Sequence, residues 1–221
     1  MFNICRNPLF LLFLCFLFQP ARAQKRISEL TLVYDYAVTI EGGNKLEGVG
    51  NAYHTLYIKG NKSRSEMTNQ LFSSTSIFDG NTGFGVILKE VSGQKLLIRM
   101  NPDNWTDRNR MYEGIHFTNT KETKIIAGYN CVKATGQTSA GATVTVFYTR
   151  ELLPENKSYD PIFTTLEGLP LEYELTNGNV KISYRFSKMS LNPVPASKFD
   201  IPSGGYREMN YDESKKMNVG G

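Results

Sequence analysis

The strongest constraint on the fold is an alternation of apolar and polar residues with a period of two. In the segment LTLVYDYAVTI, apolar or aromatic side chains occupy the even positions from Leu30 to Ile40, and the odd positions include Asp35 and Thr39. Successive side chains of a strand point to opposite faces of its sheet, so this pattern indicates a strand with one face on a core. Residues 170–176 and 179–190 repeat the pattern. The chain is therefore expected to be mainly β.

Short turns separate these runs. They contain glycine or asparagine, which tolerate the positive φ angles of tight hairpin loops, and they fall at Gly60-Asn61, Asp79-Gly80, Ser92-Gly93 and Asn177-Gly178. Strands joined this tightly must be antiparallel. We expect strands near residues 29–41, 49–59, 62–70, 74–79, 84–91, 95–100, 115–120, 124–135, 142–150, 170–176 and 179–190.

Two segments depart from the strand pattern. NPDNWTDRNRMYEG (101–114) predicts a helix with Asn101 as its N-cap and Gly114 at its end. Residues 159–166 lie in a stretch rich in proline and turn residues, where only a short helix is expected. The polar, glycine-rich residues 203–221 are expected to form a flexible tail. Without a repeat or linker, residues 24–202 are expected to form one domain.

A sheet of this size needs cover for its apolar face. Only one or two short helices are available, so a twisted antiparallel sheet must curl around them, around its own far edge or around a ligand. The expected fold class is mainly β (α+β): a curled antiparallel sheet that forms an unclosed half-barrel, with the helices over its concave face.

The first 23 residues have the pattern of a cleaved signal peptide. A positive residue, Arg6, precedes an apolar run, and Ala21-Arg22-Ala23 supplies the small residues that a signal peptidase recognises. Cys15 follows Leu14, whereas a lipidation signal needs a small residue before the cysteine, so no lipoprotein is expected. These features predict a protein of the periplasm or the extracellular space.

Charge argues against a nucleic-acid partner. Loss of Arg6 and Arg22 with the signal peptide leaves 23 basic and 21 acidic residues, a net charge of +2. Proteins that bind nucleic acids or anionic membranes carry a much larger basic excess.

We expect the protein to be a monomer.

The residues that commonly carry catalysis give no catalytic pattern. His54 and His116 stand apart and form no metal-ligand spacing, and no nucleophile elbow occurs. Glu172 and Glu174 share one face of a strand and are read as a solvated outer face. Cys131 lacks a neighbouring histidine, so it is interpreted as a small core residue, with intermolecular pairing or redox sensing left open. We therefore expect that the protein is not an enzyme and that it binds no metal or cofactor.

Six ordered segments carry a family resemblance. They are TLYIKGNKSRSEM (55–67), SIFDGNTGFGVILKE (76–90), IAGYNCVKATG (126–136), VTVFYTREL (144–152), LEGLPLEYEL (166–175) and LNPVPASKFDIPSGGY (191–206). The set resembles secreted Bacteroidetes domains of unknown function related to the GLPGLI family. Here the motif is reduced to Gly168-Leu169-Pro170, followed by Leu171, which makes the chain similar to a relative of that family and not to a member.

The resemblance also implies a fold and a function. These families are similar in pattern to the periplasmic lipoprotein carriers LolA and LolB, in which an unclosed antiparallel barrel holds acyl chains on its concave side. The resemblance therefore implies a half-barrel here and supplies no catalytic residue.

Trp105 is the only tryptophan and lies on the one predicted helix, where it would plug or line the cavity. The expected function is to hold a hydrophobic ligand, such as an acyl chain, lipid or lipoprotein, in the concave cavity. The predicted lining is Phe84, Met100, Trp105, Phe163 and Leu166. The alternatives are an envelope structural or interaction domain with a filled core, and a hydrolase on an unusual fold.

Overall fold

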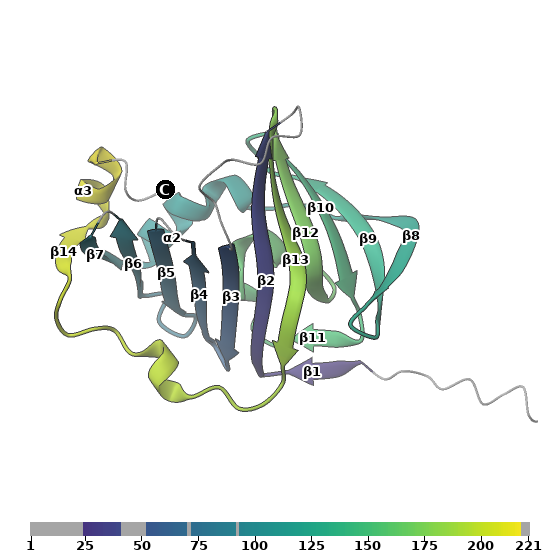
Figure 1. Cartoon of the computed structure of the whole chain (residues 1–221), viewed down its shortest axis with the longest axis horizontal. Helices are drawn as coiled ribbons and strands as arrows, with labels where there is room; N and C mark the ends of the chain where they lie inside the picture. Colours follow the sequence, from purple (N-terminus) through teal and green to yellow (C-terminus); the bar gives the residue numbers. More distant parts are fainter. Residues whose placement is uncertain (1–23, 41–51, 70–71, 92, 218–221) are drawn as a thin grey trace, which may run out of the picture.

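The computed structural model describes residues 24–40, 52–69, 72–91 and 93–217. The predicted signal peptide, residues 1–23, lies outside the described residues. One large sheet dominates the chain, and Figure 1 shows it curving from β14 at one end to β8 at the other. The order of its twelve strands is β14-β7-β6-β5-β4-β3-β2-β13-β12-β10-β9-β8.

The strand bounds follow the alternating runs of the sequence closely. The large sheet contains β2 (Glu29–Ile40), β3 (Ala52–Lys59), β4 (Lys62–Thr68), β5 (Phe72–Asp79), β6 (Gly85–Val91), β7 (Gln94–Met100), β8 (Thr118–Ile126), β9 (Tyr129–Gln137), β10 (Thr143–Thr149), β12 (Leu169–Asn177), β13 (Val180–Ser190) and β14 (Arg207–Asn210). Neighbouring strands are antiparallel except β14, which lies parallel to β7. A separate parallel pair joins β1 (Lys25–Ile27) to β11 (Leu152–Pro154). The predicted fold class is confirmed.

Both faces of the sheet are packed, by different parts of the chain. The main core lies on the concave side of β2, β3, β9, β10 and β12 and includes Leu32, Val146 and Phe163. On the same face of β6 and β7, a second cluster joins Ile98 to Trp105. On the opposite face, Val194 and Phe199 of the C-terminal segment cover β5–β7.

The helices are short, as the sequence indicates. Helix α2 (Pro102–Asn109) has Asn101 as its N-cap, and a 3-10 turn, η2 (Arg110–Tyr112), continues it toward Gly114. The predicted helix near 159–166 is replaced by two 3-10 turns, η3 (Lys157–Tyr159) and η4 (Pro161–Phe163). Another 3-10 turn, η5 (Ala196–Phe199), precedes α3 (Tyr211–Lys216).

The Gly168-Leu169-Pro170 motif has a structural role. A Cβ at Gly168 would lie 2.1 Å from the carbonyl oxygen of Thr149, so only glycine fits this close approach of two strands. The register between β10 and β12 shifts directly after it. The carbonyl oxygen of Pro170 then accepts a hydrogen bond of 2.8 Å from the Tyr34 hydroxyl.

The prediction of a flexible tail is wrong for residues 207–216. The chain leaves β13 near the middle of the sheet and crosses to its far edge, where β14 pairs with β7 and α3 follows (Figure 1). Met209 and Tyr211 are buried there beside Ile98. The polar, glycine-rich composition of the segment predicted that it would be exposed to solvent. Burial of these two side chains and pairing with the free edge of the sheet stabilise it instead.

One predicted boundary between two strands is misplaced. The expected break at residues 121–123 lies inside β8, and the turn falls at Ala127-Gly128, where both residues have positive φ angles of 51° and 83°. β8 is an edge strand whose two faces are both largely exposed to solvent, so it contains polar residues such as Thr123. Such a polar sequence resembles that of a turn. β8 and β9 therefore begin and end later than expected.

Candidate functional site

A groove of about 320 Å³ opens on the concave face, between α2 and the loop that contains η3 and η4. We call it the α2 groove. Its lining comprises His54, Leu56, Ser63, Ser65, Met67, Ser74, Ser76, Phe78, Trp105, Arg108, Asn109, Tyr112, Ser158, Tyr159, Asp160, Pro161, Ile162, Thr164, Tyr173 and Tyr184. Apolar, aromatic and uncharged polar side chains form most of this wall, and Arg108 and Asp160 are its arginine and aspartate.

The floor of the groove is a patch of serine hydroxyls on adjacent strands. Ser65 of β4 pairs in register with Ser76 of β5, and Ser74 pairs with Met67 beside them. The alternation of these strands places all four side chains on the concave face. This part of the face therefore offers hydroxyls where the neighbouring strands offer aliphatic side chains.

Trp105 of α2 forms part of the roof. Its ring lies 5.4 Å from the ring of Phe78 in an edge-to-face arrangement. A Cβ at Gly85 would lie 3.0 Å from Trp105 Cζ2 and 2.1 Å from the carbonyl oxygen of Ile77. Glycine at position 85 thus allows the indole to lie close to the sheet.

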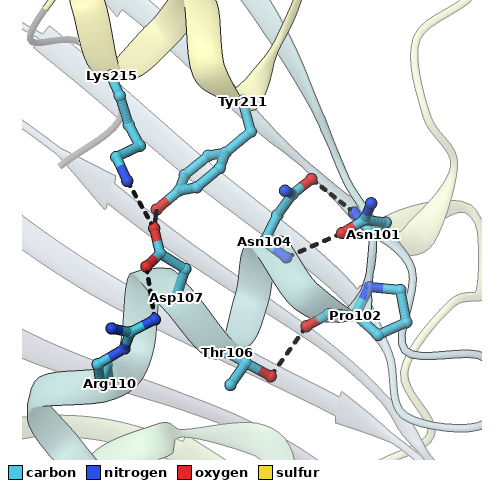
Figure 2. A network of polar contacts seen from close by, with 8 residues as sticks. All are labelled: Asn101, Pro102, Asn104, Thr106, Asp107, Arg110, Tyr211 and Lys215. Carbon is cyan, nitrogen blue, oxygen red and sulfur yellow. Dashed lines mark hydrogen bonds and ion pairs between the residues drawn. The ribbon is translucent and has the colours of Figure 1, made fainter.

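The C-terminal helix fixes α2 in place. Figure 2 shows Asp107 of α2 at the centre of the contact, where its Oδ2 accepts hydrogen bonds from Lys215 at 2.7 Å and from the Tyr211 hydroxyl at 3.1 Å. Arg110 donates to the other carboxylate oxygen at 3.0 Å. These contacts lower the pKa of Asp107, with the hydrogen bond from Lys215 as the largest cause. The roof is therefore held by residues about a hundred positions away in sequence.

The opposite wall is the loop of η3 and η4. Asp160 caps η4, since its Oδ1 accepts a hydrogen bond of 2.9 Å from the Ile162 backbone N–H. Burial raises the pKa of the Asp160 carboxyl to about 6. The preceding residue, Tyr159, is buried, and its hydroxyl has no partner within the described part of the chain.

His54 lies at the inner side of the groove. Its Nε2 is 2.8 Å from Ser65 Oγ, and its ring stacks on Tyr34 with the ring centroids 5.6 Å apart. Burial lowers the pKa of His54 to about 4, so the imidazole is neutral at pH 7. A histidine with so low a pKa is a weak general base. The arrangement is therefore suited to holding a polar group by hydrogen bonds.

Among the predicted lining residues, the structure places Trp105 in the groove. Met100 is buried in the same cluster as Trp105 and does not line the groove. Phe163 and Leu166 belong to the main core and do not line the groove. Phe84 is 56% exposed and follows the β5–β6 turn, outside the concave face. Of the five predicted residues, Trp105 is the one in the lining of the groove. The type of an apolar residue does not show whether its side chain lies deep in the core or at the surface of a cavity.

The other residues singled out in the sequence have structural positions. Cys131 is completely buried in the main core, and burial raises the pKa of its thiol to about 11. His116 is exposed. Glu172 forms an ion pair with Lys124, and Glu174 forms one with Lys181, both on the outer face of the sheet. A larger hollow of about 430 Å³ on that face has Lys124, Glu172 and Glu174 in its lining, together with aromatic residues such as Phe147.

Sequence reasoning did not identify His54, Tyr159, Asp160 and the serines of β4 and β5 as site residues. The alternation did contain a signal, since Ser63, Ser65, Ser74 and Ser76 occupy positions that face the core side once the register is known. That register depends on pairing with β3, and the roof depends on α2. Both are tertiary features.

The comparisons with known proteins concern the fold. No family model matches the sequence, and a search of curated proteins also finds no match. The solved structure of PNGF-II is similar with a TM-score of 0.50 and 16% identity, over 85% of this chain and 33% of the PNGF-II chain. The chain thus spans about a third of the length of that relative. The likeness supports the curved antiparallel sheet.

Weaker similarities extend to two further solved structures. MucB matches with a TM-score of 0.38 and 11% identity, over 80% of this chain and 58% of MucB. The Mycobacterium tuberculosis lipoprotein LppX matches with a TM-score of 0.31 and 12% identity, over 74% of this chain and 88% of LppX. Among the described residues, no helix is both long and apolar enough to cross a bilayer.

Proposed function

We propose that this chain is an exported, non-enzymatic binding protein that holds the apolar part of an amphiphilic ligand in the α2 groove. The observation that carries the proposal is the groove itself. It separates the main core from the cluster around Trp105 and is lined on both sides by apolar and aromatic groups, among them Leu56, Phe78 and Ile162. Ligand sites are mostly concave, apolar and of about this volume.

The geometry explains why the space is not filled by the protein. The serines of β4 and β5 are short, so their strands leave a gap below α2 that the longer side chains of β6 and β7 close elsewhere. Rigid elements border the gap, since α2 is fixed to α3 and the opposite loop is fixed by Asn156 and Asp160. Such a preorganised groove binds ligand with little loss of conformational entropy.

Export and the family resemblance enter as part of the proposal. The signal-peptide pattern of residues 1–23 supports a periplasmic or secreted location. The resemblance to secreted Bacteroidetes domains related to the GLPGLI family, and through them to LolA and LolB, supports a lipid or lipoprotein as the ligand. A monomeric single domain is sufficient for this function.

A chain-length series tests the proposal. The protein, stripped of lipid by organic extraction and refolding or by hydrophobic resin, is titrated with fatty acids of eight to sixteen carbons while the emission of the single tryptophan is recorded. Burial of each further methylene is worth about 0.8 kcal/mol, so affinity should rise roughly fourfold per carbon until the groove is full.

Ser76→Phe fills the floor of the groove and should abolish this binding. Ser187→Phe is the matched control, because Ser187 is exposed outside the groove. No binding at any chain length, or binding that Ser76→Phe leaves unchanged, contradicts the proposal. The first of these results would favour the alternative, an envelope interaction domain that uses a protein partner.

A further inference from the structure

One side of helix α2 faces the α2 groove and carries a positive charge into its wall. Trp105, Arg108, Asn109 and Tyr112 all belong to the lining. Their spacing of three or four residues places the four side chains on one side of a helix. Asp107 lies on another side and contacts α3 (Figure 2). The half-buried side chain of Arg108 therefore projects from the side of α2 that faces the groove.

A second cation lies close to Arg108. The register of the sheet forms one row across the concave face, from His54 through Met67 and Ser74 to Lys89. The first three residues line the groove, and the half-buried Lys89 is the next side chain of the row on the same face. Burial lowers the pKa of Lys89, and the charge of Arg108 lowers it further. The two cations are therefore near enough to act on each other.

The carboxylates next to these two cations in the chain point elsewhere. Glu90 lies on the opposite face of β6, where it forms an ion pair of 2.9 Å with Lys95. Asp107 is bound to α3. Asp160 of the lining belongs to the opposite wall, where its carboxylate accepts a hydrogen bond from the backbone of η4. The end of the groove at α2 and β6 therefore carries positive charge.

Burial of Arg108 favours an anion at this end. Removal from water disfavours the charged form of the guanidinium and lowers its pKa. A bound anion would offset that cost. A guanidinium binds carboxylates and phosphates through two parallel hydrogen bonds, and an ammonium group adds a second positive charge. Trp105, one turn before Arg108, and Phe78 beside it supply apolar surface next to the charge.

We infer that the α2 groove holds the anionic head group of an amphiphile, a carboxylate or a phosphate, at Arg108 and Lys89. The inference rests on the proposed function, since it assigns the head group of the ligand whose apolar part the groove holds. The anion belongs either to an amphiphile or to a free anion in solution, and the test separates these sources.

The experiment compares ligands that share a twelve-carbon chain and differ in the charge of their head group. Dodecyl phosphate and dodecanoate are anionic, dodecyl maltoside is neutral, and dodecyltrimethylammonium is cationic. Each is titrated below its micelle concentration, with inorganic phosphate as a further probe, and binding is measured by calorimetry. Both anionic ligands should bind at least about tenfold more tightly than the neutral and cationic ones. Added salt should narrow this margin, because it screens the charges.

Variants that remove one charge test the two side chains. Arg108→Gln and Lys89→Gln keep a long polar side chain, and each should weaken dodecyl phosphate about tenfold while dodecyl maltoside binds as before. Unchanged binding of dodecyl maltoside also shows that the groove is intact. Lys188→Gln is the matched control, because it removes a positive charge from an exposed residue outside the groove and should change neither affinity. If Arg108→Gln fails to fold, Lys89→Gln decides.

Each outcome decides one of the two proposals. If dodecyl maltoside or dodecyltrimethylammonium binds as tightly as dodecyl phosphate, or if the folded variants keep their affinity for dodecyl phosphate, the anion inference is overturned and the proposed function stands. Inorganic phosphate that binds as tightly as dodecyl phosphate supports the anion site and overturns the acyl-binding function. Failure of every probe overturns both.

Discussion

Lys215 Nζ lies 2.7 Å from Asp107 Oδ2, although 108 residues separate them in the chain. Through this contact and the adjacent Tyr211 hydroxyl, the last helix holds the roof of the α2 groove (Figure 2). The C-terminal segment is therefore part of the site's architecture.

Truncation of the side chain of Tyr211 tests this role. Tyr211 is buried against α2 and β7, so Tyr211→Ala should lower the free energy of unfolding by roughly 2–4 kcal/mol through the cavity that it leaves. It should also expose Trp105 and shift its emission to longer wavelength before unfolding. Urea titration followed by fluorescence measures both. The exposed Lys216→Ala is the control, and equal stability of the two variants would contradict the role.

Two tyrosine hydroxyls should respond to removal in opposite ways. Tyr34→Phe deletes a buried hydrogen bond to the Pro170 carbonyl oxygen, which should cost about 1–2 kcal/mol. Tyr159→Phe deletes a hydroxyl that has no partner in the described residues, so the ligand-free protein should be equally stable or more stable. Thermal unfolding of the two variants beside wild type measures the difference. If Tyr159→Phe were less stable than wild type, the Tyr159 hydroxyl would have to form a stabilising hydrogen bond, which would contradict the structure.

Gly85 should not accept even a methyl group. A Cβ there would lie 2.1 Å from the Ile77 carbonyl oxygen and 3.0 Å from the Trp105 ring, so Gly85→Ala should destabilise the protein by about 1–3 kcal/mol and displace Trp105. Gly204→Ala is the matched control, because nothing lies within 4 Å of a Cβ at that position. Near-ultraviolet circular dichroism reports the tryptophan environment. An unchanged Trp105 signal in Gly85→Ala would contradict the packing described.

The pH dependence of stability should contain two opposing contributions. The pKa of His54 is lowered to about 4 from 6.5, so the unfolded state binds its proton first and stability falls as pH decreases from about 6.5 to 4. The pKa of Asp160 is raised to about 6 from 3.8, so the native state binds its proton first and stability rises as pH decreases over about 6 to 4. Each contribution is about 3 kcal/mol, and together they largely cancel.

Single variants should reveal each contribution. Relative to wild type, His54→Gln should gain stability on acidification from pH 6.5 to 4, and Asp160→Asn should lose it. Urea midpoints measured at half-unit pH intervals give the two differences. Parallel curves for wild type and both variants would mean that neither group is buried as the structure places it.

The strands could be predicted because the signal is local. Alternation along residues 29–40 and 180–190 and the hairpin at Asn177-Gly178 need no tertiary information. The N-cap of α2 is local as well, since Asn101 and Asn104 form a capping box by themselves. Trp105 was predicted to plug or line the cavity because it lies on the one helix that the sequence indicates clearly, and the structure places it in the lining of the α2 groove.

The remaining features depend on contacts between distant residues. Residues 207–210 form a strand because the free edge of β7 pairs with them, and their own composition is that of a loop. His54 is an ordinary strand residue until its register with Ser65 and the loop at Tyr159 enclose it. Phe84 was predicted to line the cavity because it is apolar, but it follows the β5–β6 turn and is exposed, and it is not part of the lining of the α2 groove.

The most direct test of the central claim is native mass spectrometry of residues 24–221, purified from a periplasm without detergent, with organic extraction of the same sample. The account predicts one bound amphiphile per chain in wild type and none in Ser76→Phe. A mass equal to that of the protein alone, together with no uptake of added lipid or glycolipid, would contradict the claim that the α2 groove is a ligand site.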